Sequence, residues 1–477
     1  MDILQGILIT INVLLVMVTA GHALLYKRDS RAALGWISVC VIFPFAGPFL
    51  YFLFGINRVQ TRAKKLHGRF SFAFELGYGS SDEKNNTALP SVHLAPEFSD
   101  IARISDTVTM RPLVEGNRIE LLQNGEQAYP AMLEAIEGAR KSLFLSTYIF
   151  DTNDTGRTFM DALSRATGRG VDVRVIVDGF GELYSFPRAG TLLKKRGVRI
   201  ARFIPPRLFP PMLHINLRNH RKILVADGLI AFMGGMNIGD RHLADNLDNS
   251  SRVVDLHFRI TGPVTSQVEQ VFLDDWSFCT GEHTVKEPAR LVHSGSAICR
   301  TIVEGPNEDL NKLSTILVGA VSVARHRVLI MTPYFLPSRE LIAAMQTAAL
   351  RGVAVDIILP GKNNLPFVHW ASRNMLWELL QKGIRVYYQP PPFVHTKLFI
   401  MDDQYAQIGS ANMDPRSLRL NFEMAMEIYN REVVEGFTAH ALEKIGQSQE
   451  ISLKEVDTRP LFARIRDALS WLFTPYL

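Results

Sequence analysis

Two short segments of the 477-residue sequence repeat one chemical pattern: a histidine, a lysine two residues later and an aspartate five residues after the lysine. The pattern consists of His220, Lys222 and Asp227 in the first copy and of His395, Lys397 and Asp402 in the second. A small residue and an asparagine follow each copy, namely Gly235, Asn237, Ser410 and Asn412. All five positions recur at a constant offset of 175 residues. Chance rarely preserves such a register, so we interpret the two segments as a duplicated site.

These residue types suit chemistry on a phosphodiester. A neutral imidazole can attack phosphorus and form a covalent phosphohistidine, while a protonated imidazole can give its proton to the leaving alkoxide. Lysine and asparagine donate hydrogen bonds to phosphate oxygens and can stabilise the charge of the transition state. We therefore expect catalytic roles for the histidine, lysine and aspartate of both motifs, and substrate binding by Asn237, Asn412 and Ser410.

The sequence shows no pattern that would hold a metal or a disulfide. No His, Asp and Glu cluster has the spacing of metal ligands, and the fixed lysine and asparagine donors can stabilise charge without a cation. We therefore expect neither a metal nor a cofactor. Cys40, Cys279 and Cys299 form no Cys-x-x-Cys pair, so we interpret them as reduced packing residues.

Each histidine also needs a group that fixes its tautomer. Asp255 and Glu423 are the candidates, because each follows its motif at a similar distance within a strand-like run. The alternative, that both are surface carboxylates, stays open. Tyr148 and Tyr334 recur at strand ends, where each can line a pocket or pack in the core.

Strands must position the two motifs. The residues after each lysine are apolar and β-prone, and side chains two apart on a strand share a face, so histidine and lysine point into the same space. The aspartate then falls in the turn that ends the strand, where Gly228 and Asp403 follow it.

Other segments repeat between the halves as well. The apolar runs 141–150 and 327–335 each precede a helical stretch, and the strand-like runs 169–177 and 351–359 follow it. Strands that alternate with helices are typical of crossover units. We therefore predict two similar α/β lobes, each a mostly parallel sheet flanked by helices, packed face to face around one site.

Two uncharged runs lie near the N-terminus, Ile3–Leu25 and Ala32–Asn57. Each reaches the ~20 residues that a spanning helix needs, and Pro44 and Pro48 predict a kink in the second helix. The first run has neither a basic leader nor a small-x-small cleavage site, so we interpret it as a retained span rather than a signal peptide.

Charge predicts the orientation of these spans. The 52 Lys and Arg exceed the 47 Asp and Glu by a net of +5, which suits anionic membranes or phosphate ligands but proves neither. Three basic residues lie between the runs and five follow the second run, so the positive-inside rule favours a cytoplasmic globular body. These residues are Lys27, Arg28 and Arg31, and then Arg58, Arg62, Lys64, Lys65 and Arg69.

We therefore divide the chain into two transmembrane helices (1–57), a connector (58–115), a first lobe (116–295), a second lobe (296–450) and a C-terminal amphipathic tail (451–477). Apolar residues recur in the tail at helical spacing, and Trp471 adds an interface anchor. They are Phe462, Ile465, Leu469, Leu472 and Phe473. The tail can lie on a membrane or close the globular core, and both interpretations stay open.

The duplicated motif resembles that of the phospholipase D superfamily, whose pattern is H-x-K-x-x-x-x-D followed by G-S/G-x-N, twice per active site. The resemblance extends over most of the globular part, although Gly235 stands where the family has serine. The whole chain resembles bacterial cardiolipin synthases of the two-span type through residues 43–48, 219–222, 332–337 and 421–423.

The resemblance implies a membrane enzyme that joins two phosphatidylglycerol molecules into cardiolipin and releases glycerol. It implies that His220 attacks phosphorus and that Asp255 and Glu423 orient the two histidines. It also implies a location in the bacterial inner membrane, with membrane phospholipid rather than nucleic acid as partner. Nothing in the sequence indicates an oligomeric state.

Two other functions compete with this interpretation. A phospholipase D or a nuclease would use water as acceptor, and the motif does not distinguish them because acceptor choice depends on water exclusion. The paired uncharged runs favour lipid over nucleic acid, and the apolar proline-rich segment 204–213 fits either a lip that dips into lipid or an ordinary surface loop. An inactive anionic-lipid binding protein is disfavoured by the two intact motifs.

Overall fold

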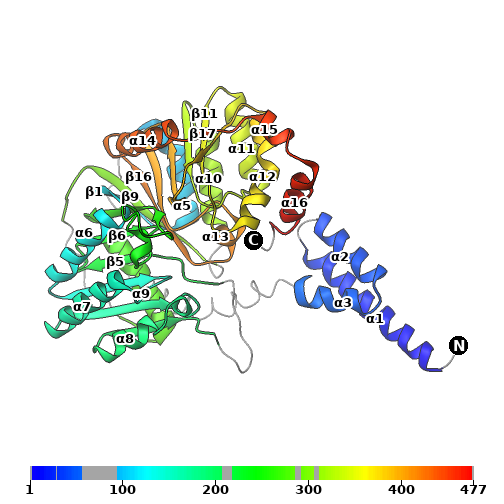
Figure 1. Ribbon diagram of the computed structural model, residues 1–477, viewed down its shortest axis with the longest axis horizontal. Coiled ribbons are helices and arrows are strands. Elements are labelled where there is room, and N and C mark those ends of the chain that lie inside the picture. Colours follow the sequence, from blue (N-terminus) through cyan, green and yellow to red (C-terminus); the bar gives the residue numbers. More distant parts are fainter. Residues whose placement is uncertain are drawn as a thin grey trace, which may run out of the picture. The chain divides into compact units, whose positions relative to one another are not determined.

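The computed structural model describes residues 3–27, 30–55, 94–206, 217–284, 292–305 and 311–474. The chain divides into two units, Met1–Leu66 and His67–Leu477. The first is helical and is drawn in blue in Figure 1, and the second contains both motifs.

Helix α1 (Ile3–Tyr26) opens the N-terminal unit, and α2 (Ser30–Ile42), α3 (Ala46–Leu50) and the π-helix η1 (Tyr51–Gly55) follow it. At 1.5 Å per residue α1 is about 36 Å long, which is enough to cross the ~30 Å hydrocarbon core of a bilayer. Among the described helices, α1 alone is long and apolar enough to cross a membrane.

The prediction of a second spanning helix is not confirmed. Instead of one kinked helix, the second uncharged run forms three short pieces, of which α2 is about 20 Å long. Pro44 lacks the N–H that would continue α2. Phe45 has a positive φ of 58°, and the chain turns back there, because Gly47 packs against the backbone of Val39.

The first lobe follows a short preceding segment. That segment contains η2 (Pro96–Phe98) and α5 (Ser99–Thr109). The lobe contains β1 (Val114–Gln123), α6 (Asn124–Gly138), β2 (Ser142–Thr147), α7 (Asp154–Gly168), β3 (Asp172–Asp178), η3 (Gly181–Tyr184), α8 (Ala189–Lys195), β4 (Arg199–Phe203), β5 (Ile223–Ala226), β6 (Ile230–Gly234), η4 (Asp240–His242), β7 (Val253–Val254), β8 (Leu256–Thr261) and α9 (Thr265–Thr280).

The second lobe repeats this order with small differences. It contains β9 (Ala297–Glu304), α10 (Lys312–Val323), β10 (Arg327–Met331), α11 (Arg339–Leu350), β11 (Ala354–Pro360), α12 (Pro366–Leu380), β12 (Arg385–Gln389), β13 (Phe393–Val394), β14 (Leu398–Met401), β15 (Tyr405–Gly409), α13 (Pro415–Arg419), β16 (Glu423–Tyr429), α14 (Arg431–Gly446), β17 (Gln449–Glu450), α15 (Leu453–Asp457) and α16 (Leu461–Leu472). Helix α5 belongs to this lobe by packing, because Ile101 and Ala102 lie in its apolar core. The predicted connector therefore ends in an element of the second lobe.

One 15-stranded sheet runs through both lobes in the order β17-β12-β11-β10-β14-β15-β16-β9-β1-β8-β6-β5-β2-β3-β4. The lobes join where β9 and β1 pair antiparallel, so the sheets meet edge to edge and not face to face. Counted outward from this junction, the order β9-β16-β15-β14-β10-β11-β12 corresponds to β1-β8-β6-β5-β2-β3-β4, and β17 has no counterpart among the described strands of the first lobe. Figure 1 shows α7 and α8 beside the sheet of the first lobe and α10, α11 and α12 beside that of the second.

The prediction of mostly parallel sheets is wrong, because each lobe has a mixed sheet. Within the described strands of this sheet, parallel pairing is confined to β2-β3-β4 and β10-β11-β12. The motif strands β5 and β14 instead enter antiparallel hairpins with β6 and β15. Three residues separate the paired strands of each hairpin, and the first two have positive φ: Asp227 (53°) and Gly228 (67°) in one, and Asp402 (52°) and Asp403 (54°) in the other. Such turns join antiparallel strands.

The motif aspartates stabilise these hairpins from outside the cavity that holds the histidines. The carboxylate of Asp227 accepts hydrogen bonds from the backbone N–H groups of residues 140, 141 and 142 at the start of β2. Asp402 accepts the matching bonds from residues 325, 326 and 327 at 2.7–2.9 Å. This geometry differs from the expected catalytic role, since it commits both carboxylates to the fold.

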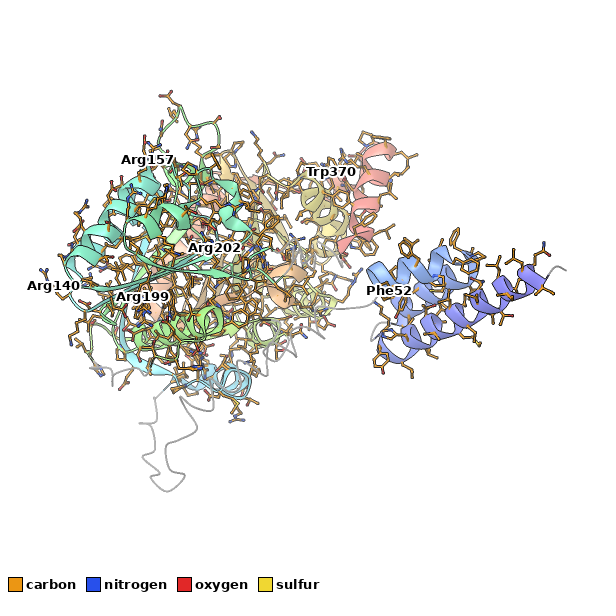
Figure 2. All side chains as sticks on the ribbon, turned by 90° about the horizontal axis from the view of Figure 1, so that it is seen from below. Phe52, Arg140, Arg157, Arg199, Arg202 and Trp370 are labelled. Carbon is orange, nitrogen blue, oxygen red and sulfur yellow. The ribbon has the colours of Figure 1, made fainter. Side chains whose placement is uncertain are left out.

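The C-terminal helix α16 packs on α12 with its polar side inward. Asp467 is fully buried and pairs with Arg373 (2.8 Å), Arg466 (2.9 Å) and Arg459. Figure 2 shows Trp370 of α12 beside this helix, and the Arg466 guanidinium lies 4.4 Å from its ring. The opposite side of α16 exposes large apolar residues, namely Leu461, Phe462, Ile465, Leu469, Leu472 and the adjoining Phe473.

We expect Asp402→Ala to lower the free energy of unfolding by about 1–3 kcal/mol, because three backbone N–H groups lose a charged acceptor. Thermal or denaturant unfolding of the full chain in detergent measures this loss. Asp403→Ala is the matched control, since its carboxylate accepts one hydrogen bond from the Thr438 hydroxyl. An Asp402→Ala protein that unfolds like wild type but has lost turnover would contradict a structural role.

Candidate active site

A cavity of about 890 Å³ lies between the two lobes within the second unit, and both motifs open into it. Seven of the residues expected to act on substrate line this cavity: His220, Lys222, Asn237, His395, Lys397, Ser410 and Asn412. Tyr148 and Tyr334 line it as well, with the Tyr148 ring 4.4 Å from that of His220 and the Tyr334 ring 6.5 Å from that of His395. The duplicated segments thus form one site.

Each motif lysine is held by its own motif. Lys222 Nζ donates to the backbone carbonyl of His220 at 2.6 Å, and Lys397 Nζ donates to that of His395 at 2.5 Å. Both lysines are buried, and each lies two residues after its histidine on the same side of the chain. The ammonium groups therefore stand beside the imidazoles, as the spacing predicts.

The backbone of each histidine pairs with the other lobe. The His220 N–H donates to the Phe422 carbonyl at 2.9 Å, and the His395 N–H donates to the Val254 carbonyl at 2.7 Å. Strand β13 also pairs in parallel with β7, so residues just before His395 lie beside residues just before Asp255. Each motif thus enters the site along a segment that ends in a carboxylate of the opposite lobe.

The carboxylates consequently lie beside the histidines in a crossed arrangement. Asp255 Oδ2 of the first lobe lies 2.8 Å from Nδ1 of His395, and Glu423 Oε1 of the second lobe lies 3.3 Å from Nδ1 of His220. Both carboxylates are fully buried, which excludes the alternative of surface residues. The structure brings both carboxylates named from the sequence to a histidine, but their order along the chain gave no sign of the crossing.

The two carboxylate positions are not equivalent. Ser410 Oγ donates to Glu423 Oε2 at 2.5 Å, so its hydroxyl positions a carboxylate although Ser410 also lines the cavity. At the matching position a Cβ on Gly235 would lie 2.4 Å from Asp255 Oδ1. A serine there would collide with Asp255, so glycine accompanies the shorter and closer carboxylate. The missing hydroxyl of the first motif thus has a steric cause.

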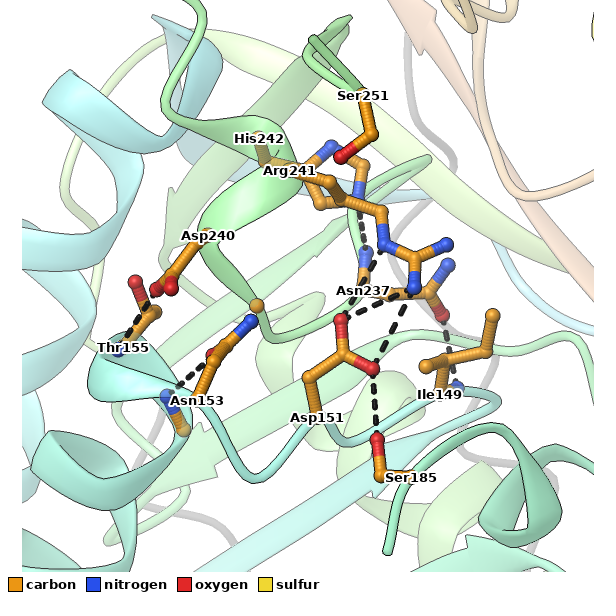
Figure 3. Close-up of polar contacts among 12 residues, drawn as sticks. Ile149, Asp151, Asn153, Thr155, Ser185, Asn237, Asp240, Arg241, His242 and Ser251 are labelled. Carbon is orange, nitrogen blue, oxygen red and sulfur yellow. Dashed lines mark hydrogen bonds and ion pairs between the residues drawn. The ribbon is translucent and has the colours of Figure 1, made fainter. Parts of the chain in front are cut away.

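The asparagines are fixed by the walls of the cavity. The Asn237 side-chain oxygen accepts from the backbone N–H of Ile149 at 3.0 Å, which orients its NH2 end toward the cavity (Figure 3). Its own backbone N–H donates to Nε2 of His242 at 3.2 Å. Asn412 donates to the Ser417 hydroxyl at 3.1 Å.

A cation stands beside Asn237 in the same wall. Arg241 lines the cavity and forms an ion pair with Asp151 at 3.1 Å (Figure 3). Asp151 also accepts from the Ser185 hydroxyl at 2.8 Å. Because this carboxylate is held from two sides, the Arg241 guanidinium is fixed in the wall of the cavity.

The electrostatics of the cavity favour an anionic ligand. Burial lowers the pKa of Lys397 to about 7, and Asp255 offsets part of this shift. Burial also lowers the pKa of Lys222 and that of His395, where Lys397 and Lys222 add repulsion. A negatively charged group in the cavity would relieve this repulsion and restore the charged forms.

Among the described residues, no group of three or more His, Cys, Asp and Glu side chains is arranged to hold a metal ion. The donors that face the cavity are lysine, imidazole, amide and guanidinium groups, which suit phosphate oxygens. The expectation of catalysis without metal or cofactor stays a prediction.

Sequence reasoning missed a buried ion-pair network behind the first motif. Arg221 Nη1 pairs with Asp275 at 2.5 Å, and its Nε donates to the Glu423 backbone carbonyl at 3.1 Å. Arg218 pairs with Asp178 at 3.2 Å, and both are buried. Arg221 lies between His220 and Lys222, just before β5, and alternation along the chain directs its side chain away from theirs. This position was the available indication of the buried network.

Comparison with known proteins identifies the family. Residues 132–276 and 317–444 match the family described as cardiolipin synthase, phospholipase D-like domain. Residues 11–55 match the family described as phospholipase D-nuclease N-terminal.

Relatives extend over nearly the whole chain. A cardiolipin synthase of Geobacillus kaustophilus is 30% identical over 95% of this chain and 90% of its own length. The major cardiolipin synthase ClsA of Bacillus subtilis is 28% identical over 100% of this chain and 99% of its own length. A phosphatidylserine synthase of Haemophilus influenzae shares the fold, with a TM-score of 0.59 at 15% identity, over 79% of this chain and 100% of its own. The chain therefore belongs to the cardiolipin synthase family of phospholipase D-like proteins.

Proposed function

We propose that this protein is a cardiolipin synthase, a phosphatidyltransferase that moves a phosphatidyl group from one phosphatidylglycerol to another and releases glycerol. The observation that carries this proposal is the single cavity in which two histidines, each paired with a buried carboxylate, stand beside two lysines. The names of the full-length relatives support the same reaction.

The reaction proceeds in two displacements at phosphorus. In the first, one imidazole Nε2 attacks the phosphorus, the bond from phosphorus to the glycerol oxygen breaks, and the other imidazolium protonates the leaving alkoxide. In the second, that imidazole takes the proton from the hydroxyl of an incoming phosphatidylglycerol. The hydroxyl oxygen attacks phosphorus and the phosphorus–nitrogen bond breaks. Lys222, Lys397 and the two asparagines hold the phosphate oxygens throughout.

Attack by His220 stays a prediction that comes from the family resemblance, and His395 then acts as acid and base. Burial, with repulsion from Lys397 and Lys222, lowers the pKa of His395 and so favours its neutral form in the empty cavity. A bound phosphodiester anion offsets the repulsion from Lys397 and Lys222 and so favours the imidazolium. Substrate binding itself then prepares His395 to donate a proton.

The rim of the cavity supports a lipid substrate over nucleic acid. Tyr184 and Leu247 of the first lobe and Leu365 of the second line the cavity and are exposed. Apolar side chains at a cavity mouth suit acyl chains better than a charged polymer. The proline-rich lip around Leu208 lies outside the described residues and does not enter this argument.

A product assay tests the proposed function. Purified full-length protein in detergent, with phosphatidylglycerol and a chelator, should form cardiolipin and glycerol. His220→Ala and His395→Ala should each slow turnover by at least about 10²–10⁴-fold, because one histidine does not serve as nucleophile and acid at once. His283→Ala, at an exposed histidine outside the cavity, is the matched control.

Two outcomes of this assay would overturn parts of the proposal. Phosphatidic acid as the main product would make the protein a hydrolase that uses water as acceptor. Activity lost on chelation and restored by one specific divalent ion would contradict the expected metal-free mechanism.

The crossed pairs predict a selective effect on the two histidines. Asp255→Asn should change the reaction rate of His395 with diethyl pyrocarbonate and leave His220 unchanged, whereas Glu423→Gln should do the reverse. Mass spectrometry of the modified peptides measures both rates in each variant. Both substitutions should lower turnover, by about 10²–10⁴-fold, because the tautomer is no longer fixed. An effect of each variant on the histidine of its own lobe would refute the crossing.

We also propose that α16 rests on the membrane surface through its exposed apolar side. Its buried Asp467, held by three arginines, fixes the side that faces outward. Phe473 at its end lies 5.8 Å from Phe367 of α12, and Phe367 lines the cavity mouth. The apolar surface thus continues from α16 to the entrance through which a lipid would pass.

Replacing Phe462 and Leu469 together by serine should raise the KM for phosphatidylglycerol in bilayers by about tenfold or more, because two side chains lose their interfacial burial. The KM for detergent-dispersed substrate should change little. Leu442→Ser, at an exposed leucine of α14, is the control. Equal losses in bilayer and detergent would mean that α16 serves the fold and not the membrane.

A further inference from the structure

The chain folds back on itself within the N-terminal unit at a defined depth. The backbone N–H of Phe45, in the turn after α2, donates to Asn12 Oδ1 of α1 at 2.9 Å. Asn12 lies 14 residues before Tyr26, or about 21 Å along α1, and α2 has a length of about 20 Å. The turn therefore stands beside the middle of α1 and short of its N-terminal end.

The segment after the turn then returns along α1. The Tyr51 hydroxyl lies 2.7 Å from Nδ1 of His22, one turn before the end of α1, and its ring lies 5.4 Å from that of Trp36 on α2. Tyr51 is fully buried with Ala23 and Cys40. Gly55, four residues later, ends η1. The described part of this unit thus ends near the place where α1 meets α2.

The contacts of α2 and α3 agree with a tight reversal. A Cβ on Gly47 would lie 2.3 Å from the backbone oxygen of Val39, so α3 packs on α2 at a distance that only glycine permits. Asn12 satisfies an N–H that would otherwise stand unpaired at membrane depth, where non-helical backbone needs a partner within the protein. The outer surfaces carry exposed apolar residues, among them Leu34, Val41, Phe49 and Phe52.

We propose that α1 is the one membrane span of this unit and that α2, α3 and η1 form a re-entrant hairpin, which enters and leaves the bilayer on the same side. Under this topology Ser30 lies on the same side of the membrane as the catalytic lobes. Two full spans would put it on the opposite side.

The hairpin also changes the charge balance across the membrane. Two spans would divide the flanking basic residues into three and five, whereas the hairpin collects all eight at the C-terminal end of α1. The positive-inside rule then assigns this side to the cytoplasm by a much larger margin. The inference deepens the proposed function, on which it rests for the substrate: phosphatidylglycerol would come from the cytoplasmic leaflet.

Labelling with a membrane-impermeant maleimide tests the side of each segment. The full chain is used with its native cysteines replaced by alanine, in right-side-out membrane vesicles. Single cysteines replace Ser30, Ile3 at the other end of α1, and Gly436 on α14, where a side chain meets no other atom. Ile3→Cys should react at once, while Ser30→Cys and Gly436→Cys should react only after the vesicles are opened.

Two results of the labelling would overturn the proposal in part or in full. Reaction of Ser30→Cys in intact vesicles with Gly436→Cys protected would establish two spans and refute the hairpin. Reaction of both in intact vesicles, with Ile3→Cys protected, would keep the hairpin and overturn the cytoplasmic placement.

Cross-linking tests the hairpin without reference to side. In a continuous second helix Tyr51 would stand about 32 Å from Ser30 and therefore beside Gln5. A short bifunctional maleimide should join His22→Cys to Tyr51→Cys and should not join Gln5→Cys to Tyr51→Cys. Gly47→Leu should prevent the first cross-link, whereas Gly35→Leu, where the added atoms meet open space, should keep it.

The opposite pattern of cross-links would refute the hairpin. Neither labelling nor cross-linking requires turnover, so the topology and the proposed activity fail independently. A chain that makes cardiolipin but cross-links Gln5→Cys to Tyr51→Cys would lose only the hairpin.

Discussion

The hydrogen bonds from the backbone N–H groups of His220 and His395 to the carbonyls of Phe422 and Val254 set the geometry of the site. In each case the accepting residue directly precedes a buried carboxylate. Each of these bonds therefore fixes the register of its motif. It also places the side chain that follows the acceptor, Glu423 or Asp255, beside the imidazole. Neither lobe holds a complete catalytic group, so the joined sheet and the strands that flank it serve first to keep the two motifs in register.

Burial of Asp255 and Glu423 costs free energy, and it also keeps the two carboxylates in fixed positions. Asp255 and Glu423 are removed from water, which is costly for a charge unless partners surround it. The partners are the opposite imidazole and, for Glu423, the Ser410 hydroxyl, while the Arg221 guanidinium holds the adjoining backbone. Because these groups are fixed before substrate arrives, the site need not reorganise when charge develops at phosphorus. The same burial lowers the pKa of Lys397 to about 7, and an anion in the cavity would raise this pKa again.

The sequence predicted the parts of this site that are local. Each histidine and lysine, two residues apart, reach the same cavity as predicted, although β5 and β14 begin just after the lysines and not at the histidines. The repeated offset indicated one common cavity. The crossed pairing was out of reach, because the register between β13 and β7 joins segments far apart in the chain. The hydrogen bonds of the Asp227 carboxylate were out of reach for the same reason, since its partners lie at and just before the start of β2. The break of the second uncharged run into short helices was also out of reach, because hydropathy does not report a backbone turn such as that at Phe45, where φ is positive.

The matching strand orders on either side of the β1–β9 junction have a consequence for the symmetry of the molecule. In a twofold homodimer the contacts across the interface are reciprocal. If residue i of one subunit contacts residue j of the other, residue j of the first also contacts residue i of the second. Here a single chain makes that interface with itself. A homodimer must carry every substitution twice, whereas a fused pair can change one half alone. The two halves differ in this way: Gly235 lies beside Asp255 in the first half, and Ser410 lies beside Glu423 in the second. A fused architecture can thus give the two halves of one site unequal parts in a reaction.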